Sequence, residues 1–176
     1  MKLQEWLRDR EGLLAERWIQ EIRTGRDPGN LEGLDIMEVV VRELVSMIPY
    51  CFGEKRDAAR ENWQHASYLY GSLALLRGLA AGDVVDELQL LRGVILRLFL
   101  TEDEPSGGHF TGGIPAMEFL ALNRILDMGV SRASIAYVDD LFFTHLQGSG
   151  VPTDLDEDKK LEIRRQFQTL REELTG

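Results

Sequence analysis

The sequence predicts an all-α fold, a bundle of about five to six helices followed by a C-terminal linker helix. Apolar residues recur at the three- and four-residue spacing of amphipathic helices along most of the 176 residues. The five prolines fall where other helix breakers gather. No segment has the strict alternation of apolar and polar residues that is typical of a half-buried strand. A chain of this length corresponds to about one domain with one core.

The first expected helix covers residues 3–24. Its apolar side chains fall on one stripe with the 3.6-residue period of an amphipathic helix. The members of this stripe are Leu3, Leu7, Leu14, Trp18 and Ile22. The turn-forming residues 25–30, which include glycine, proline and asparagine, predict the end of this helix.

The second expected helix begins near Asp35. We expect the Asp35 side chain to cap this helix, with Glu38 reaching back from three residues later as in a capping box. Pro49 ends it, because the residue before a proline avoids the helical conformation.

Two further helices are expected in the middle of the chain. The third covers residues 56–77, and Gly78 with the small residues after it ends the helix. Asp83 is expected to cap the fourth helix, which continues to about Leu98. Four glycines and a proline then predict a loop over residues 102–113.

The fifth expected helix begins near Pro115, a residue suited to a first helical turn. It either continues to about Leu146 or breaks near Gly129. The side chains expected to face the core are Leu122, Ile125, Leu126, Ala133, Tyr137 and Leu141.

The remaining residues divide into a linker at 148–153 and a charged helix at 154–176, so that residues 1–147 form the main domain. Apolar residues of the last helix are spaced four, three and four apart, as in a short heptad seam. They are Ile163, Phe167, Leu170 and Leu174. We expect this seam to pair with a second copy and transmit a signal. The alternative is that the helix docks back onto its own domain.

The charge balance makes nucleic acid and membranes poor partners. Lysine and arginine number 20 against 30 acidic residues, for a net charge of −10 and a pI near 4.8. Such a surface repels phosphate backbones and anionic lipids, and no apolar run approaches the about 18 residues of a membrane-spanning helix. The single cysteine, Cys51, excludes an internal disulfide and fits a reducing compartment. We therefore expect a cytoplasmic protein.

No arrangement of residues predicts catalysis. The sequence lacks a serine nucleophile elbow, a phosphate-binding glycine loop and a dinucleotide fingerprint. Cys51 follows a helix end among large apolar residues, which favours an inert buried thiol. The three histidines are far apart, and no two ligands share a helical face, so we expect no metal site. The sequence therefore favours a protein without an enzyme activity.

His65 is a candidate ligand residue, and Arg92 is a candidate for a structural ion pair. His65 lies on a helix with apolar neighbours and is the candidate axial ligand if the domain binds haem or a small ligand, although a histidine satisfied in a core or interface is the more common case. Arg92 follows Leu91 within an apolar helix, so we expect it to form a buried structural ion pair, with Glu87 or Asp127 as partner.

The segment from His65 to Leu98 resembles a known signalling domain. It contains His-Ala-Ser-Tyr-Leu-Tyr-Gly-Ser-Leu at 65–73, Arg-Gly at 77–78, Asp-Val-Val-Asp-Glu-Leu at 83–88 and Leu-Arg-Gly-Val-Ile-Leu at 91–96. These stretches are similar to the N-terminal domain of the RsbT co-antagonist (RsbR/RsbRD) family, which also precedes many bacterial sensor histidine kinases. The resemblance covers roughly residues 5–147 and rests on helix-packing patterns.

The resemblance implies a globin-like helical fold that is usually free of haem, forms homodimers and passes a signal through a C-terminal helix to an output module. In the family that output is a STAS domain within the stressosome, or a kinase. Residues 148–176 are too few for either module. The family supplies no catalytic residues, and it implies no cofactor.

Overall fold

The computed structural model describes residues 3–25, 33–101, 116–148 and 155–176, and in these ranges all regular structure is helical. The elements are α1 (Leu3–Asp9), α2 (Glu11–Thr24), α3 (Leu34–Met47), the 3₁₀ helix η1 (Ile48–Phe52), α4 (Arg56–Leu76), α5 (Ala81–Thr101), α6 (Ala116–Leu146) and α7 (Glu157–Thr175). The predicted all-α class is therefore confirmed. The expected linker at 148–153 and the expected loop at 102–113 lie outside the described residues, apart from Gly148.

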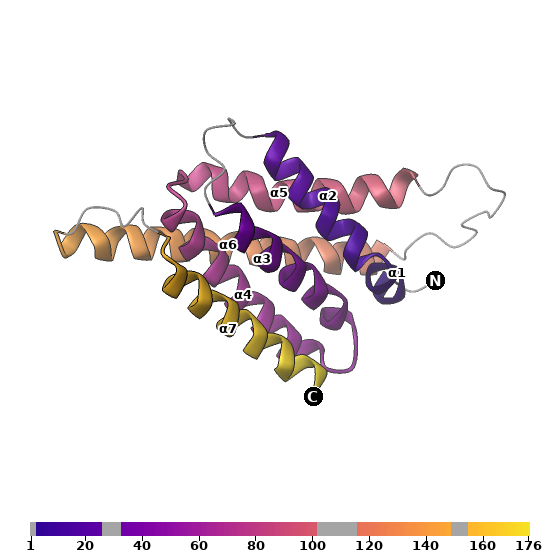
Figure 1. Cartoon of the computed structure of the whole chain (residues 1–176). Helices are drawn as coiled ribbons and strands as arrows, with labels where there is room; N and C mark the ends of the chain where they lie inside the picture. Colours follow the sequence, from indigo (N-terminus) through magenta and orange to yellow (C-terminus); the bar gives the residue numbers. More distant parts are fainter. Residues whose placement is uncertain (1–2, 26–32, 102–115, 149–154) are drawn as a thin grey trace.

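The helices are arranged around the pair formed by α4 and α6 (Figure 1). Helix α5 packs on α6, and α2 crosses α3 and α5. Helix α7 lies along α3 and α4 and ends at the lower edge of the view in Figure 1. Each of these helices contributes to one continuous apolar core, although the C-terminal turns of α6 lie outside it.

Helices α4 and α6 approach each other closely at two points. At Gly71 the approach leaves no room for a side chain, since a Cβ atom there would lie 2.0 Å from the carbonyl oxygen of Ala133. At Gly129 a Cβ atom would lie 2.7 Å from the Trp63 ring. The Trp63 Nε1–H group donates a hydrogen bond of 2.7 Å to the carbonyl oxygen of Ile125. Small residues therefore allow the two backbones to pack directly against each other.

The first expected helix is divided in two. Arg10, with φ −117° and ψ 9°, separates α1 from α2. The break lets the two halves pack in different directions: α1 contacts η1, and its Trp6 ring meets Phe99 edge-on, whereas α2 crosses α3 and α5. The stripe residues expected to be buried are buried in both halves.

Both expected caps need correction. Helix α3 is preceded by Gly33, whose φ of 78° favours glycine. Asp35 lies in the first turn and accepts a 3.2 Å hydrogen bond from Lys160 of α7 instead. Asp83 lies inside α5, where its carboxylate accepts from the backbone N–H of Ala80 at 2.8 Å. Each aspartate is thus near the predicted helix start, but two or three residues further in than a cap.

Helix α6 is continuous over 31 residues and does not break at Gly129. The missing side chain at Gly129 makes space for the Trp63 ring, so the glycine serves the packing of α6 on α4 and does not end the helix. The expected inward residues are buried with one exception: Leu141 is 39% exposed, because α6 has left the bundle at that position.

The C-terminal helix belongs to the core of the domain. Phe167, Leu170 and Leu174 are buried against α3 and α4, and Ile163 packs beside them. The side-chain amide of Asn62 on α4 donates a 2.8 Å hydrogen bond to the Leu170 carbonyl. This packing corresponds to the alternative expectation, in which the last helix docks back onto its own domain, because its apolar side chains lie against α3 and α4.

The close contact at Gly71 leads to a test. Replacing Gly71 with alanine should lower the free energy of unfolding by about 2 kcal/mol or more, because α4 and α6 must separate to accept the methyl group. The matched control is Gly82→Ala, where nothing lies within 4 Å and alanine favours the helix. Urea denaturation measures both. Equal stabilities of the two variants would contradict the close approach.

Candidate functional site

A buried ion pair joins α4 to α5. The two terminal nitrogens of Arg77 each donate to one carboxylate oxygen of Glu87, and both distances are 3.0 Å. Their side chains are only 3% and 4% exposed. Burial by itself lowers the pKa of Arg77, but the Glu87 carboxylate and the Tyr70 hydroxyl together raise this pKa above its ordinary value. The contact has the two-point geometry that suits an arginine guanidinium and a carboxylate.

Two aromatic residues complete this buried network. The Tyr70 hydroxyl donates to the Glu87 carboxylate, and the Trp18 Nε1–H donates to the Glu87 carbonyl at 2.7 Å. The Trp18 and Tyr70 rings stack with their centroids 5.9 Å apart. Helices α2, α4 and α5 thus meet at Glu87. Both charges are enclosed and engaged with each other, so the network has the character of a structural support.

Arg92 forms an ion pair with Asp127, one of the two partners that the sequence indicated. The expected burial is wrong, because the Arg92 and Asp127 side chains are 23% and 64% exposed. The other expected partner, Glu87, pairs with Arg77. Sequence periodicity missed this choice because both arginines follow apolar residues on neighbouring helices.

His65 is exposed on α4, in a shallow depression lined by Glu61, Gln64, Tyr68 and Arg132. Arg132 donates a 2.9 Å hydrogen bond to the side-chain oxygen of Gln64. These polar and charged neighbours do not fit a haem, which needs an apolar crevice beside its axial ligand.

Cys51 is fully buried, and burial raises the pKa of its thiol to about 12. The thiolate form that reacts with electrophiles and metals is therefore strongly disfavoured. This agrees with an inert thiol in the core.

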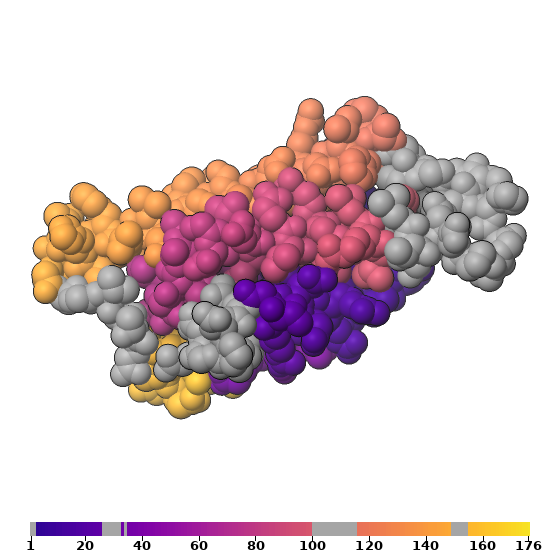
Figure 2. All heavy atoms as spheres, turned by 90° about the horizontal axis from the view of Figure 1, so that it is seen from above, coloured from indigo at the N-terminus to yellow at the C-terminus, as the bar shows by residue number. Residues whose placement is uncertain are grey.

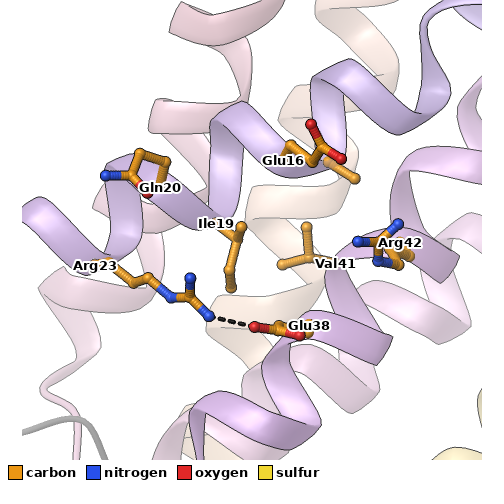
Figure 3. Close-up of a pocket in the computed structure, with 8 residues that line it drawn as sticks. Glu16, Ile19, Gln20, Arg23, Glu38, Val41 and Arg42 are labelled. Atoms are coloured by element: carbon orange, nitrogen blue, oxygen red, sulfur yellow. Dashed lines mark hydrogen bonds and ion pairs between the residues drawn. The ribbon is translucent and has the colours of Figure 1, made fainter.

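A groove on the surface lies between α2 and α3 (Figure 3). Ile19 and Val41 contribute apolar side chains, and charged side chains surround them. Arg23 and Glu38 form an ion pair across the groove, as the dashed line in Figure 3 marks. Its charges are of both signs and two of them neutralise each other, so this groove favours no single class of ligand.

The C-terminal part of α6 carries an exposed apolar surface. Figures 1 and 2 both show these turns extending past the neighbouring helices. The side chains Ile135, Val138, Phe142 and Leu146 share one face and are spaced three or four residues apart. Their exposures are 43%, 57%, 58% and 64%. We name these four residues the α6 outer stripe.

The α6 outer stripe lies opposite the face that carries Ala133, Ala136 and Tyr137, which are buried. Helix α6 is therefore apolar on two faces, and only one of them is covered in the described part of the chain. The sequence contained this signal, since the apolar residues of 135–146 are too many for a single face. A helix with a second apolar face is typical of one that has a further partner.

Comparisons with known protein families, with curated proteins and with solved structures found no match to this chain. Among the described residues, no group of three or more His, Cys, Asp or Glu side chains is placed to hold a metal ion. No helix in the described ranges has the length and apolar character needed to cross a membrane.

The buried network predicts a difference between two arginines. Arg77→Met should cost about 3–5 kcal/mol of stability, because it leaves the Glu87 carboxylate buried without its cation. Arg92→Met should cost less than about 1 kcal/mol, because its ion pair is partly exposed to water. Chemical denaturation of both variants measures the difference.

A double variant separates the pair itself from the unpaired charge. Arg77→Met with Glu87→Leu should be more stable than Arg77→Met alone, since no buried charge is then left. Arg77→Met and Arg92→Met variants of equal stability would show that the buried ion pair does not support the fold.

Proposed function

We propose that this chain is a non-catalytic input domain of bacterial signal transduction, cytoplasmic and homodimeric, that passes a signal to a protein output module. The observation that carries the proposal is the α6 outer stripe, an apolar surface at the end of a helix that leaves the bundle. The resemblance of residues 5–147 to the RsbR/RsbRD family supports the class of function and a globin-like arrangement. A STAS-type module or a kinase is the proposed output.

The proposed transmission element is α6, in place of the C-terminal helix that the sequence suggested. On α7, Phe167, Leu170 and Leu174 are already buried within the chain. Those of the α6 outer stripe are exposed and have the spacing that a partner helix recognises. A second copy or the output module would cover them.

The packing of α6 gives the proposal a physical route. This helix has 31 residues, which corresponds to about 45 Å of continuous helix. Its middle is held against α4 by the direct contacts at Gly71 and Gly129. A shift of α4 would therefore move α6 as a rigid body, and its projecting end would change position.

The test is a comparison of two double variants. Val138→Glu with Phe142→Glu should abolish self-association and leave the thermal midpoint nearly unchanged, because both side chains are exposed in the monomer. Phe167→Glu with Leu170→Glu should instead lower stability by about 3 kcal/mol or more, because it places charges in the core. Light scattering over a concentration series and thermal melts followed by circular dichroism measure both properties.

The wild-type protein decides the dimer proposal. We expect its mean mass to rise with concentration. A strictly monomeric protein at high concentration would overturn the homodimer, and self-association unaffected by Val138→Glu with Phe142→Glu would remove the α6 outer stripe as its interface.

A further inference from the structure

The N-terminal half of α6 forms a second, separate groove with the start of α4. Its apolar side chains are Met117, Leu120, Ala121, Ile125 and Met128. Met117 and Leu120 are 73% and 51% exposed, which is unusual for large apolar residues in an acidic protein. Two methionines give the groove an adaptable apolar wall. We name this feature the α4–α6 groove.

The charged residues of the α4–α6 groove are both cations, Arg60 from α4 and Arg124 from α6. In the described part of the chain, Arg124 has no acidic partner, and Arg60 has only Asp57, at 4.0 Å and strongly exposed. The Arg60 Nε atom is buried without a hydrogen-bond acceptor. Glu118, the acid nearest in the sequence to this end of α6, accepts from the backbone N–H of Leu3.

This arrangement is a locally basic, apolar groove on a protein whose net charge is −10. Repulsion by the rest of the surface disfavours highly charged polyanions, whereas a single negative group can be held between two guanidinium groups. The apolar wall beside them fits a hydrocarbon chain. The two features together select a molecule with one anionic head and one apolar tail.

We propose that the α4–α6 groove binds a small amphipathic carboxylate, such as a medium-chain fatty acid. The carboxylate lies between Arg60 and Arg124, and the hydrocarbon chain lies along Met117, Leu120 and Met128. The Ile125 carbonyl, on the same turns of α6, accepts the Trp63 hydrogen bond. A ligand in the groove therefore contacts and shifts the turns of α6 that are held against α4. Only this last step rests on the proposed function.

The binding test uses decanoate as the probe, with decanol as its neutral counterpart, both below the concentrations at which they aggregate. Isothermal titration calorimetry should show one saturable decanoate site. The affinity for decanol should be lower by at least about tenfold, because decanol lacks the charge that the two arginines recognise. Equal binding of decanol, or no saturable binding of decanoate, would overturn the proposal.

Two variants locate the site. Arg60→Gln with Arg124→Gln should weaken decanoate binding about tenfold or more, while thermal stability stays close to wild type. The control is Arg56→Gln, which removes an exposed cation from the same helix outside the groove. If the double variant binds as tightly as the control, the carboxylate binds elsewhere and the proposal fails.

The titration is repeated in the Val138→Glu, Phe142→Glu background, which separates this proposal from the dimer. Binding there should match wild type, whether or not the wild-type protein self-associates. A decanoate affinity that falls as wild-type protein concentration rises, and does not fall in this background, would show that a second copy occupies the groove and would overturn the ligand proposal.

Discussion

The direct packing of α4 against α6 is the constraint on which the remaining structure depends. It requires a residue without a side chain at Gly71, where a Cβ atom would meet the Ala133 carbonyl at 2.0 Å, and another at Gly129 beneath Trp63. Because the two backbones are this close, α6 cannot rotate about its axis without steric overlap. The contact therefore decides which face of α6 enters the core and which face stays outside. Both surfaces that we connect with function, the α6 outer stripe and the α4–α6 groove, are consequences of that orientation.

The buried Arg77–Glu87 pair has a different role from the apolar contacts around it. Removing two charges from water is costly, so such a pair contributes less net stability than its short distances suggest. The pair instead specifies how the helices are arranged. Its two-point contact and the hydrogen bonds from Tyr70 and Trp18 are satisfied only when α2, α4 and α5 meet in one arrangement. A hydrogen bond of 2.6 Å from the Tyr137 hydroxyl to the Leu79 carbonyl adds α6 to the connection between α4 and α5. The polar interior thereby specifies the arrangement that the apolar residues stabilise.

Helices α6 and α7 are buried to a different extent from what their sequences suggest. The last helix is highly charged and has a narrow apolar seam, which is typical of a helix that pairs with another chain. In the structure that seam completes the core, and polar contacts to Asn62, Asp35 and Glu43 hold the helix in place. Helix α6, which the sequence indicated as an ordinary core helix, keeps an apolar face exposed where it extends past the bundle. A surface for a partner is therefore better sought on α6.

The sequence by itself determined the helical class, the extent of α4 and the inward faces of α2 and the first half of α6, because the period of apolar residues depends only on local geometry. It also named Asp127 as a partner for Arg92.

Only the tertiary structure decided that Arg77 pairs with Glu87, that α1 and α2 separate at Arg10, and that α7 folds back onto the domain. These outcomes depend on which distant side chains and helix surfaces meet, such as Trp63 with Gly129 or Phe167 with the groove between α3 and α4. A residue's own neighbours in the chain carry no information about that meeting. The exposed half of α6 was likewise decided by the tertiary structure. Its apolar face is buried or exposed according to how far the rest of the bundle extends beside it.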